Sequence, residues 1–190
     1  FSIVGLPEAA VRESKDRVRA AIINSGFEFP ARRITVNLAP ADLPKDGGRY
    51  DLPIALGILA ASGQIAKAGL ENYEFHGELA LSGLLREVNG SLPVALAAQQ
   101  DNKQLVLPCI SAQQAALIEH AEIYSADNLL SVCQHLQGLI LLPKANLPPS
   151  LQTPVTVPDM SDVRGQHRAR RALEVAAAGR HNMLMVGPPG

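Results

Sequence analysis

The sequence predicts an α+β fold of mixed helices and strands, and three features of the chain support this class. Residues 52–61 (LPIALGILAA) carry no charge, and a helix that is apolar on every side is a buried helix. From Pro93 onward, helical and strand patterns alternate, which is typical of βαβ units with some parallel sheet. Residues 182–186 (NMLMV) are an apolar run that leads into GPPG, as expected of a central parallel strand followed by a glycine-rich loop.

Composition allows a large core and excludes several classes of protein. Of the 190 residues, 47% are hydrophobic and 18% are charged, so disorder is not expected. The formal net charge is −1, so any contact with nucleic acid has to come from a local patch. Two cysteines are too few for a disulfide framework or a zinc site, and they fit a reducing cytoplasm. The chain contains neither a membrane-length apolar run nor a secretory signal, so a cytoplasmic location without membrane contact is predicted.

The first part of the chain alternates between strand and helix patterns. The strand patterns cover residues 1–5, 33–38, 73–81, 103–107 and 122–124. The helical patterns cover residues 7–25, 52–61, 93–100, 112–119 and 127–136. Asp51 and Ser111 stand where N-caps are expected, and Asp127 or Asn128 starts the last of these helices. The basic residues of the first helix are interpreted as a solvated face, with a DNA-contacting face as the less favoured interpretation.

A change in composition divides the chain into three parts. Residues 143–158 contain five prolines and almost no charge, which is typical of an extended linker. The predicted organisation is therefore a domain over 1–142, a linker over 143–158 and the start of a second domain over 159–190. Because the chain opens without methionine and stops inside a motif, we expect it to be an internal piece of a longer protein.

The end of the second part carries the clearest chemical motif. A strand that delivers the chain into a glycine-rich loop is the start of a P-loop, whose backbone amides hold phosphates at a helix N-terminus. Gly187 fits the first position of that motif, and a helical pattern over 166–178 precedes it. The residues predicted to contact nucleotide are Val163, Gly165, Gln166, Gly187, Pro188, Pro189 and Gly190. No metal ligands are predicted, because the five histidines form neither an i, i+4 pair nor a cluster with cysteine.

Two stretches resemble one family of ATPases. Residues 162–166 (DVRGQ) and 181–190 (HNMLMVGPPG) resemble the opening of an AAA+ module of the magnesium-chelatase type. Residues 24–26, 37–45 and 47–55 resemble the N-terminal domain of bacterial magnesium-chelatase-like proteins, so the similarity covers nearly the whole chain. The resemblance implies a ribosomal-S5/Lon-protease-like first domain, followed by the first helix and strand of a P-loop AAA+ module.

The same resemblance implies a function for the whole protein. Members of this family are ATPases that use ATP and Mg²⁺ and assemble into rings, expected here to be hexamers. Some act on branched or single-stranded DNA during natural transformation, in branch migration or a helicase role. Within this chain no catalytic residue is expected, and the chain alone is expected neither to hold ATP tightly nor to hydrolyse it.

The likeness to Lon also suggests a peptidase, which the residues disfavour. The nucleophile position falls on or next to Asp51 and the base position near Leu92, and neither side chain can supply a Ser-Lys dyad. A non-enzymatic module that recruits protein or DNA stays open as a function, and so does a true metal-chelatase subunit. The role of the glycine-rich loop over 47–51, as a site or as a plain turn, stays open too.

Overall fold

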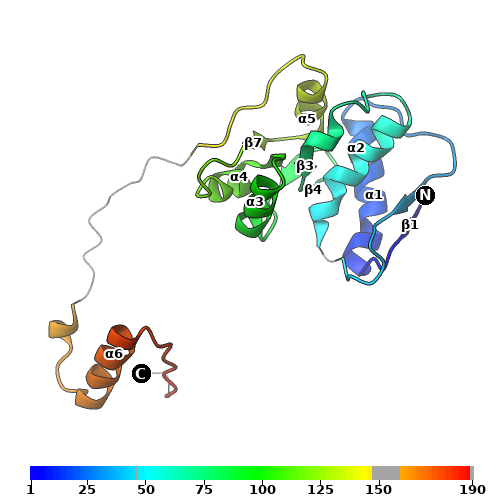
Figure 1. Cartoon of the computed structure of the whole chain (residues 1–190). Helices are drawn as coiled ribbons and strands as arrows, with labels where there is room; N and C mark the ends of the chain where they lie inside the picture. Colours follow the sequence, from blue (N-terminus) through cyan, green and yellow to red (C-terminus); the bar gives the residue numbers. More distant parts are fainter. Residues whose placement is uncertain (46, 147–158, 189–190) are drawn as a thin grey trace. The chain divides into compact units, whose positions relative to one another are not determined.

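The computed structural model describes residues 1–45, 47–146 and 159–188, and its contacts divide the chain into two units, Phe1–Pro149 and Ser150–Gly190 (Figure 1). Most of the linker predicted at 143–158 lies outside the described residues. Its first residues belong to the first unit, since the Pro143 carbonyl accepts a bond from Ser125 N–H and Ala145 N–H donates to Ile123.

The first unit mixes helices and short strands, which confirms the α+β class. Its strands are β1 (Ser2–Val4), β2 (Thr35–Asn37), β3 (Tyr73–Phe75), β4 (Glu78–Leu79), β5 (Leu85–Arg86), β6 (Gln104–Pro108) and β7 (Ile123–Ala126). Its α-helices are α1 (Ala9–Asn24), α2 (Asp51–Ala61), α3 (Ser91–Gln100), α4 (Cys109–Ala115) and α5 (Leu129–Leu136). Two 3₁₀ turns, η1 (Gly48–Tyr50) and η2 (Leu70–Asn72), complete it.

The strands in the described ranges form three small sheets. β3, β6 and β7 are parallel in that order, with Phe75 beside Val106 and Val106 beside Tyr124. β1 and β2 are parallel to each other, and β4 and β5 make an antiparallel hairpin. The parallel sheet and the β6–α4–β7 crossover confirm the βαβ organisation predicted after Pro93.

The strand predicted at 73–81 is two strands in two sheets. The chain turns between them, where His76 N–H donates to Val106 and Gly77 N–H donates to the Arg49 carbonyl. His76 is still bonded to β6, whereas Gly77 is bonded to η1, and the pairing of β4 with β5 begins only at Glu78. The single-strand prediction was therefore wrong at this turn.

The core of the first unit forms where α1 packs against α2. Eight of the eleven residues of α2 are buried, as its uncharged sequence predicts. α1 contributes Val18, Ala21 and Ile22 from one face, while most of its charged residues are exposed on the other. The glycine-rich loop before α2 is thereby anchored by a buried helix.

Two predicted N-caps were wrong, because both side chains have partners outside their own helix. Asp51 is the first residue of α2 and makes no capping bond. Ser111 lies inside α4, and its hydroxyl bonds to the backbone of Val88. The cap predicted for α5 is confirmed at Asn128, whose side chain accepts from Ser131 N–H.

The second unit contains a 3₁₀ turn, η3 (Met160–Asp162), and the helix α6 (His167–Gly179). The helix agrees with the prediction, whereas the strand predicted at 182–186 is absent from the described residues. Leu184 and Val186 are 86% and 88% exposed, and no described strand runs beside them. A strand needs a neighbour for its backbone hydrogen bonds, so the apolar pattern alone does not produce one.

Candidate functional site

Three of the residues predicted to contact nucleotide, Val163, Gly165 and Gln166, lie together in the turn that enters α6. Val163 is extended, and Gly165 and Gln166 both have left-handed backbones, with φ of +72° and +48°. The carbonyl of Val163 accepts a bond of 3.2 Å from Arg170 Nη1, which ties this turn to the helix. Upstream, Asp159 and Asp162 form a reciprocal capping box that fixes η3. The turn is thus a defined structure that presents backbone groups.

The phosphate-side residues are described only in part. Gly187 and Pro188 follow the exposed segment after α6, and Pro189 and Gly190 lie outside the described residues. Among the described residues, a Cβ atom added at Gly187 would meet nothing within 4 Å. Residues 181–183 return to α6 and line a hollow of about 660 Å³ with His167, Arg168 and Val175. No described contact joins Gly187 to Val163 or Gly165.

The glycine-rich loop over 47–51 is held by bonds to the β4 region. Leu52 N–H donates to the Gly77 carbonyl at 3.0 Å, and Gly77 N–H donates to Arg49 at 3.1 Å. Gly48 lies so close to the Glu78 side chain that an added Cβ would collide with it. A residue with a Cβ at this position would require the Glu78 side chain to move.

A buried ion pair lies at the start of α2. Asp51 is completely buried, and Arg17 of α1 donates to both its oxygens, Nε to Oδ2 at 2.7 Å and Nη2 to Oδ1 at 3.2 Å. Leu79 N–H donates a third bond to Oδ2 at 3.2 Å. The carboxylate is therefore inaccessible to a substrate and joins α1, α2 and β4.

The electrostatics of this pair follow from burial and bonding. Burial raises the pKa of Asp51, and the bonds from Arg17 and Leu79 oppose that rise. The hydrogen bond to Asp51 raises the pKa of Arg17. The two bonds from the guanidinium are arranged as in a bidentate pair between arginine and a carboxylate.

The carboxyl ends of β6 and β7 bring a thiol beside a carboxylate. Cys109 Sγ donates to Asp127 Oδ1 at 2.8 Å and accepts from the Ser125 hydroxyl at 2.9 Å. Burial and the Asp127 bond raise the pKa of the Cys109 thiol, so it is not activated as a nucleophile. Across the described ranges, no group of three or more His, Cys, Asp and Glu residues could hold a metal ion.

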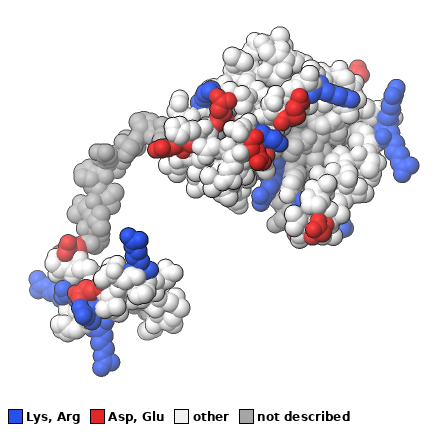
Figure 2. Space-filling model, viewed as in Figure 1, with Lys and Arg blue, Asp and Glu red and all other residues white. Residues whose placement is uncertain are grey.

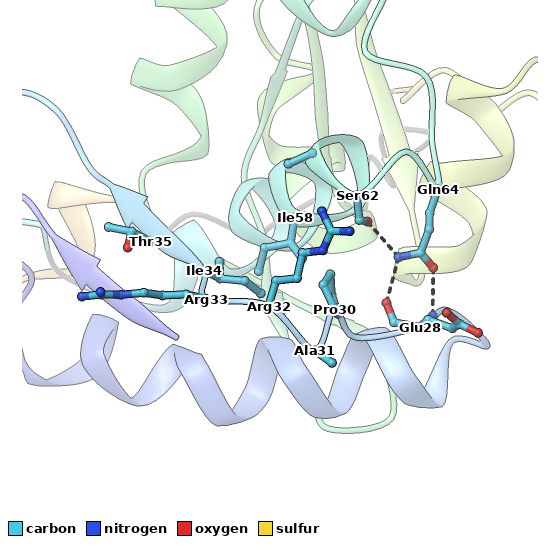
Figure 3. A pocket seen from close by; sticks show the side chains of 11 residues that line it. Glu28, Pro30, Ala31, Arg32, Arg33, Ile34, Thr35, Ile58, Ser62 and Gln64 are labelled. Carbon is cyan, nitrogen blue, oxygen red and sulfur yellow. Dashed lines mark hydrogen bonds between the residues drawn. The ribbon is translucent and has the colours of Figure 1, made fainter.

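Charged residues are distributed differently in the two units. Figure 2 shows acidic and basic side chains interspersed over the visible face of the larger unit, whereas residues 159–188 carry five arginines and three acidic residues. Within the larger unit, Arg32 and Arg33 line a hollow beside α2, shown in Figure 3. This hollow was not predicted from the sequence. In the sequence, Arg33 belongs to the strand pattern over 33–38 and Arg32 directly precedes it, and neither was assigned a role in a site.

The matches to known families cover both units of the chain. Residues 1–110 match the family model described as subunit ChlI of Mg-chelatase, and residues 159–190 match a second model, described as magnesium chelatase, subunit ChlI. The chain therefore belongs to the magnesium-chelatase ChlI-like family.

Its similarity to individual proteins extends over its whole length. It is 50% identical over 195 residues to the competence protein ComM of Haemophilus influenzae, an alignment that covers 100% of this chain and 38% of that protein. It is 49% identical over 190 residues to the uncharacterized protein YifB of Salmonella typhimurium, covering 100% of this chain and 37% of YifB. Identity to the uncharacterized protein Rv2897c of Mycobacterium tuberculosis is 41% over 189 residues, an alignment that covers 99% of this chain and 37% of that protein. The chain thus spans less than two-fifths of the length of these relatives.

No helix in the described part of the chain combines the length and the apolar character that crossing a membrane requires.

Proposed function

We propose that the whole protein is a ring-forming AAA+ ATPase that couples hydrolysis of Mg-ATP to the remodelling of branched or single-stranded DNA. The observation that carries this proposal is the 50% identity to a competence protein across the full chain. Competence is the uptake of DNA by a cell, so an ATP-driven activity on DNA fits that name. Family membership at residues 159–190 supports the ATPase part.

The nucleotide is assigned to the second unit. Val163, Gly165 and Gln166 would contact adenine through backbone groups, and residues 187–190 would hold phosphates through backbone amides. The open space at Gly187 among the described residues fits this role, because phosphate can approach closely only where no side chain intervenes. When bound, Mg²⁺ would neutralise phosphate charge; the described residues contain no cluster that would ligate it.

The first test is hydrolysis of ATP by the full-length protein with and without DNA. We expect single-stranded or branched DNA to stimulate hydrolysis, and Gly187→Val to abolish it, because a branched side chain blocks the approach of phosphate. Thermal unfolding of the variant should match that of the wild type. Hydrolysis that is unaffected by DNA, together with no binding of DNA, would refute the proposal.

A second candidate is a metal-chelatase subunit, which the description of both matching family models favours. The two functions differ in what stimulates the ATPase. A chelatase subunit requires partner subunits and a tetrapyrrole substrate, whereas the proposed enzyme responds to DNA alone. Measuring hydrolysis with DNA as the only addition separates them.

A further inference from the structure

A groove runs between the segment that leads into β2 and the C-terminal half of α2. Its wider end is a hollow of about 600 Å³, shown in Figure 3, which is in the size range of small-molecule sites. Ile34, Ile58 and Pro30 give it an apolar floor. Gln64 closes one end by bonding to Ser62 and to the backbone of Glu28, at 2.8–2.9 Å.

The hollow continues along β2 as a second space of about 320 Å³. The two spaces share Ile34, Thr35, Ile58 and Ala61, so they form one groove, which we call the β2 groove. Within the described ranges β2 pairs only with β1. Alternate residues of a strand bond to the same neighbour, so the N–H and C=O groups of Thr35 and Asn37 point away from β1.

The groove carries positive charge at its wider end. Arg32 and Arg33 are both exposed, and neither forms an ion pair among the described contacts. Figure 3 shows Arg32 rising beside Ile58 and Arg33 extending away from it, so the two guanidinium groups are spread apart. Glu28 is the one acidic residue in the lining of this end.

We infer that the β2 groove binds a single strand of nucleic acid, with phosphates on Arg32 and Arg33 and bases against the apolar floor. Two exposed guanidinium groups beside an apolar surface offer partners for both the phosphates and the bases of a single strand. The backbone groups of β2 that point away from β1 supply further donors and acceptors. A duplex is convex and hides its base faces, so it cannot use this floor. This inference rests on the proposed action on DNA. It places one contact between the protein and DNA in the first unit.

The test is binding of a fluorescein-labelled oligothymidylate to the 190-residue chain, measured by fluorescence anisotropy over a series of salt concentrations. Arg32→Ala/Arg33→Ala should weaken binding roughly tenfold or more and reduce the slope of log K against log salt by about 1.4, as expected for two lost phosphate contacts. Arg32→Lys/Arg33→Lys should restore most of both. Thermal unfolding should be unchanged, because both side chains are exposed.

Two further variants distinguish groove binding from general attraction to positive charge. Gly57 lines the groove, and a Cβ there would meet nothing within 4 Å, so Gly57→Leu fills the groove without changing charge. It should weaken binding and leave the salt slope unchanged. The matched control, Arg168→Ala/Arg171→Ala on α6, removes the same charge from the other unit and should leave binding nearly unaffected.

The inference is overturned if the α6 variant loses binding while the Arg32/Arg33 variant keeps it, or if Gly57→Leu binds like the wild type. Binding of a peptide strand to the groove without competition from the oligonucleotide would overturn it as well. In the full-length protein, wild-type stimulation of ATP hydrolysis by DNA in Arg32→Ala/Arg33→Ala would refute this site and leave the proposed function standing. Absence of stimulation in the wild-type protein would instead refute the proposed function.

Discussion

Replacing Arg17 with alanine should be among the most destabilising single changes on the charged face of α1. Within the described residues it removes two of the three hydrogen bonds to Asp51, whose carboxylate is completely buried, and leaves the Leu79 N–H as a donor. Breaking a buried pair by removing one partner costs about 3–5 kcal/mol, because the other charge is left uncompensated. The Arg17 side chain is 22% exposed, so we expect a value near 3 kcal/mol.

The Asp51 variants should differ from the Arg17 variant in a defined order. Asp51→Ala removes the buried charge and leaves the Leu79 N–H without its acceptor, which costs about 1–3 kcal/mol of stability. Arg17 can then turn to water, so the loss should be smaller than in Arg17→Ala. Asp51→Asn should fall close to Asp51→Ala, because its amide group places a donor against the Arg17 guanidinium.

The assay is unfolding in guanidinium chloride followed by circular dichroism, with Arg12→Ala as the matched control. Arg12 lies on the same helix and is exposed, and among the described contacts its side chain bonds to the Pro7 carbonyl, so its removal should change stability by about 0.5 kcal/mol or less. If Asp51 were only an N-cap, Arg17→Ala would be as mild as Arg12→Ala, and Asp51→Asn would be nearly silent. That pattern would refute the ion-pair reasoning.

Three further predictions concern glycine, histidine and cysteine residues. Gly57→Ala should stabilise the chain by about 0.5–1 kcal/mol, because alanine is favoured over glycine in a helix and its Cβ has open space. Gly5→Ala should destabilise the chain by more than 1 kcal/mol, because Gly5 has φ of +100° and its Cβ would collide with Leu38. Chemical denaturation measures both changes in the free energy of unfolding. Burial lowers the pKa of His76 to about 4, so the unfolded chain takes up the proton first. The stability that His76 contributes is therefore complete above about pH 6.5 and is lost as pH falls toward 4, and His76→Gln should flatten that part of a stability–pH profile. Burial raises the pKa of Cys133 to about 12, so a thiol reagent at neutral pH should modify this thiol only when the chain unfolds. The absorbance of the reagent's product measures the modification.

The sequence determined those features that depend on neighbours along the chain. The uncharged run of α2 required burial, the apolar face of α1 required a core, and the cap at Asn128 followed from residue type and position. The residues that carry the family resemblance are also local, so the family was evident from the sequence. The predicted nucleotide residues belong to this group, and their roles stay predictions.

The tertiary structure decided the features that join distant residues. Arg17 and Asp51 are 34 positions apart, so local spacing favoured a cap for Asp51 and gave no sign of its partner. The β2 groove exists only because residues 28–35 lie against residues 58–64. The apolar run at 182–186 shows the converse, since a strand pattern forms no strand in the described residues where no neighbour offers hydrogen bonds. Periodicity fixes which side chains avoid water, whereas pairing and cavities depend on which surfaces meet.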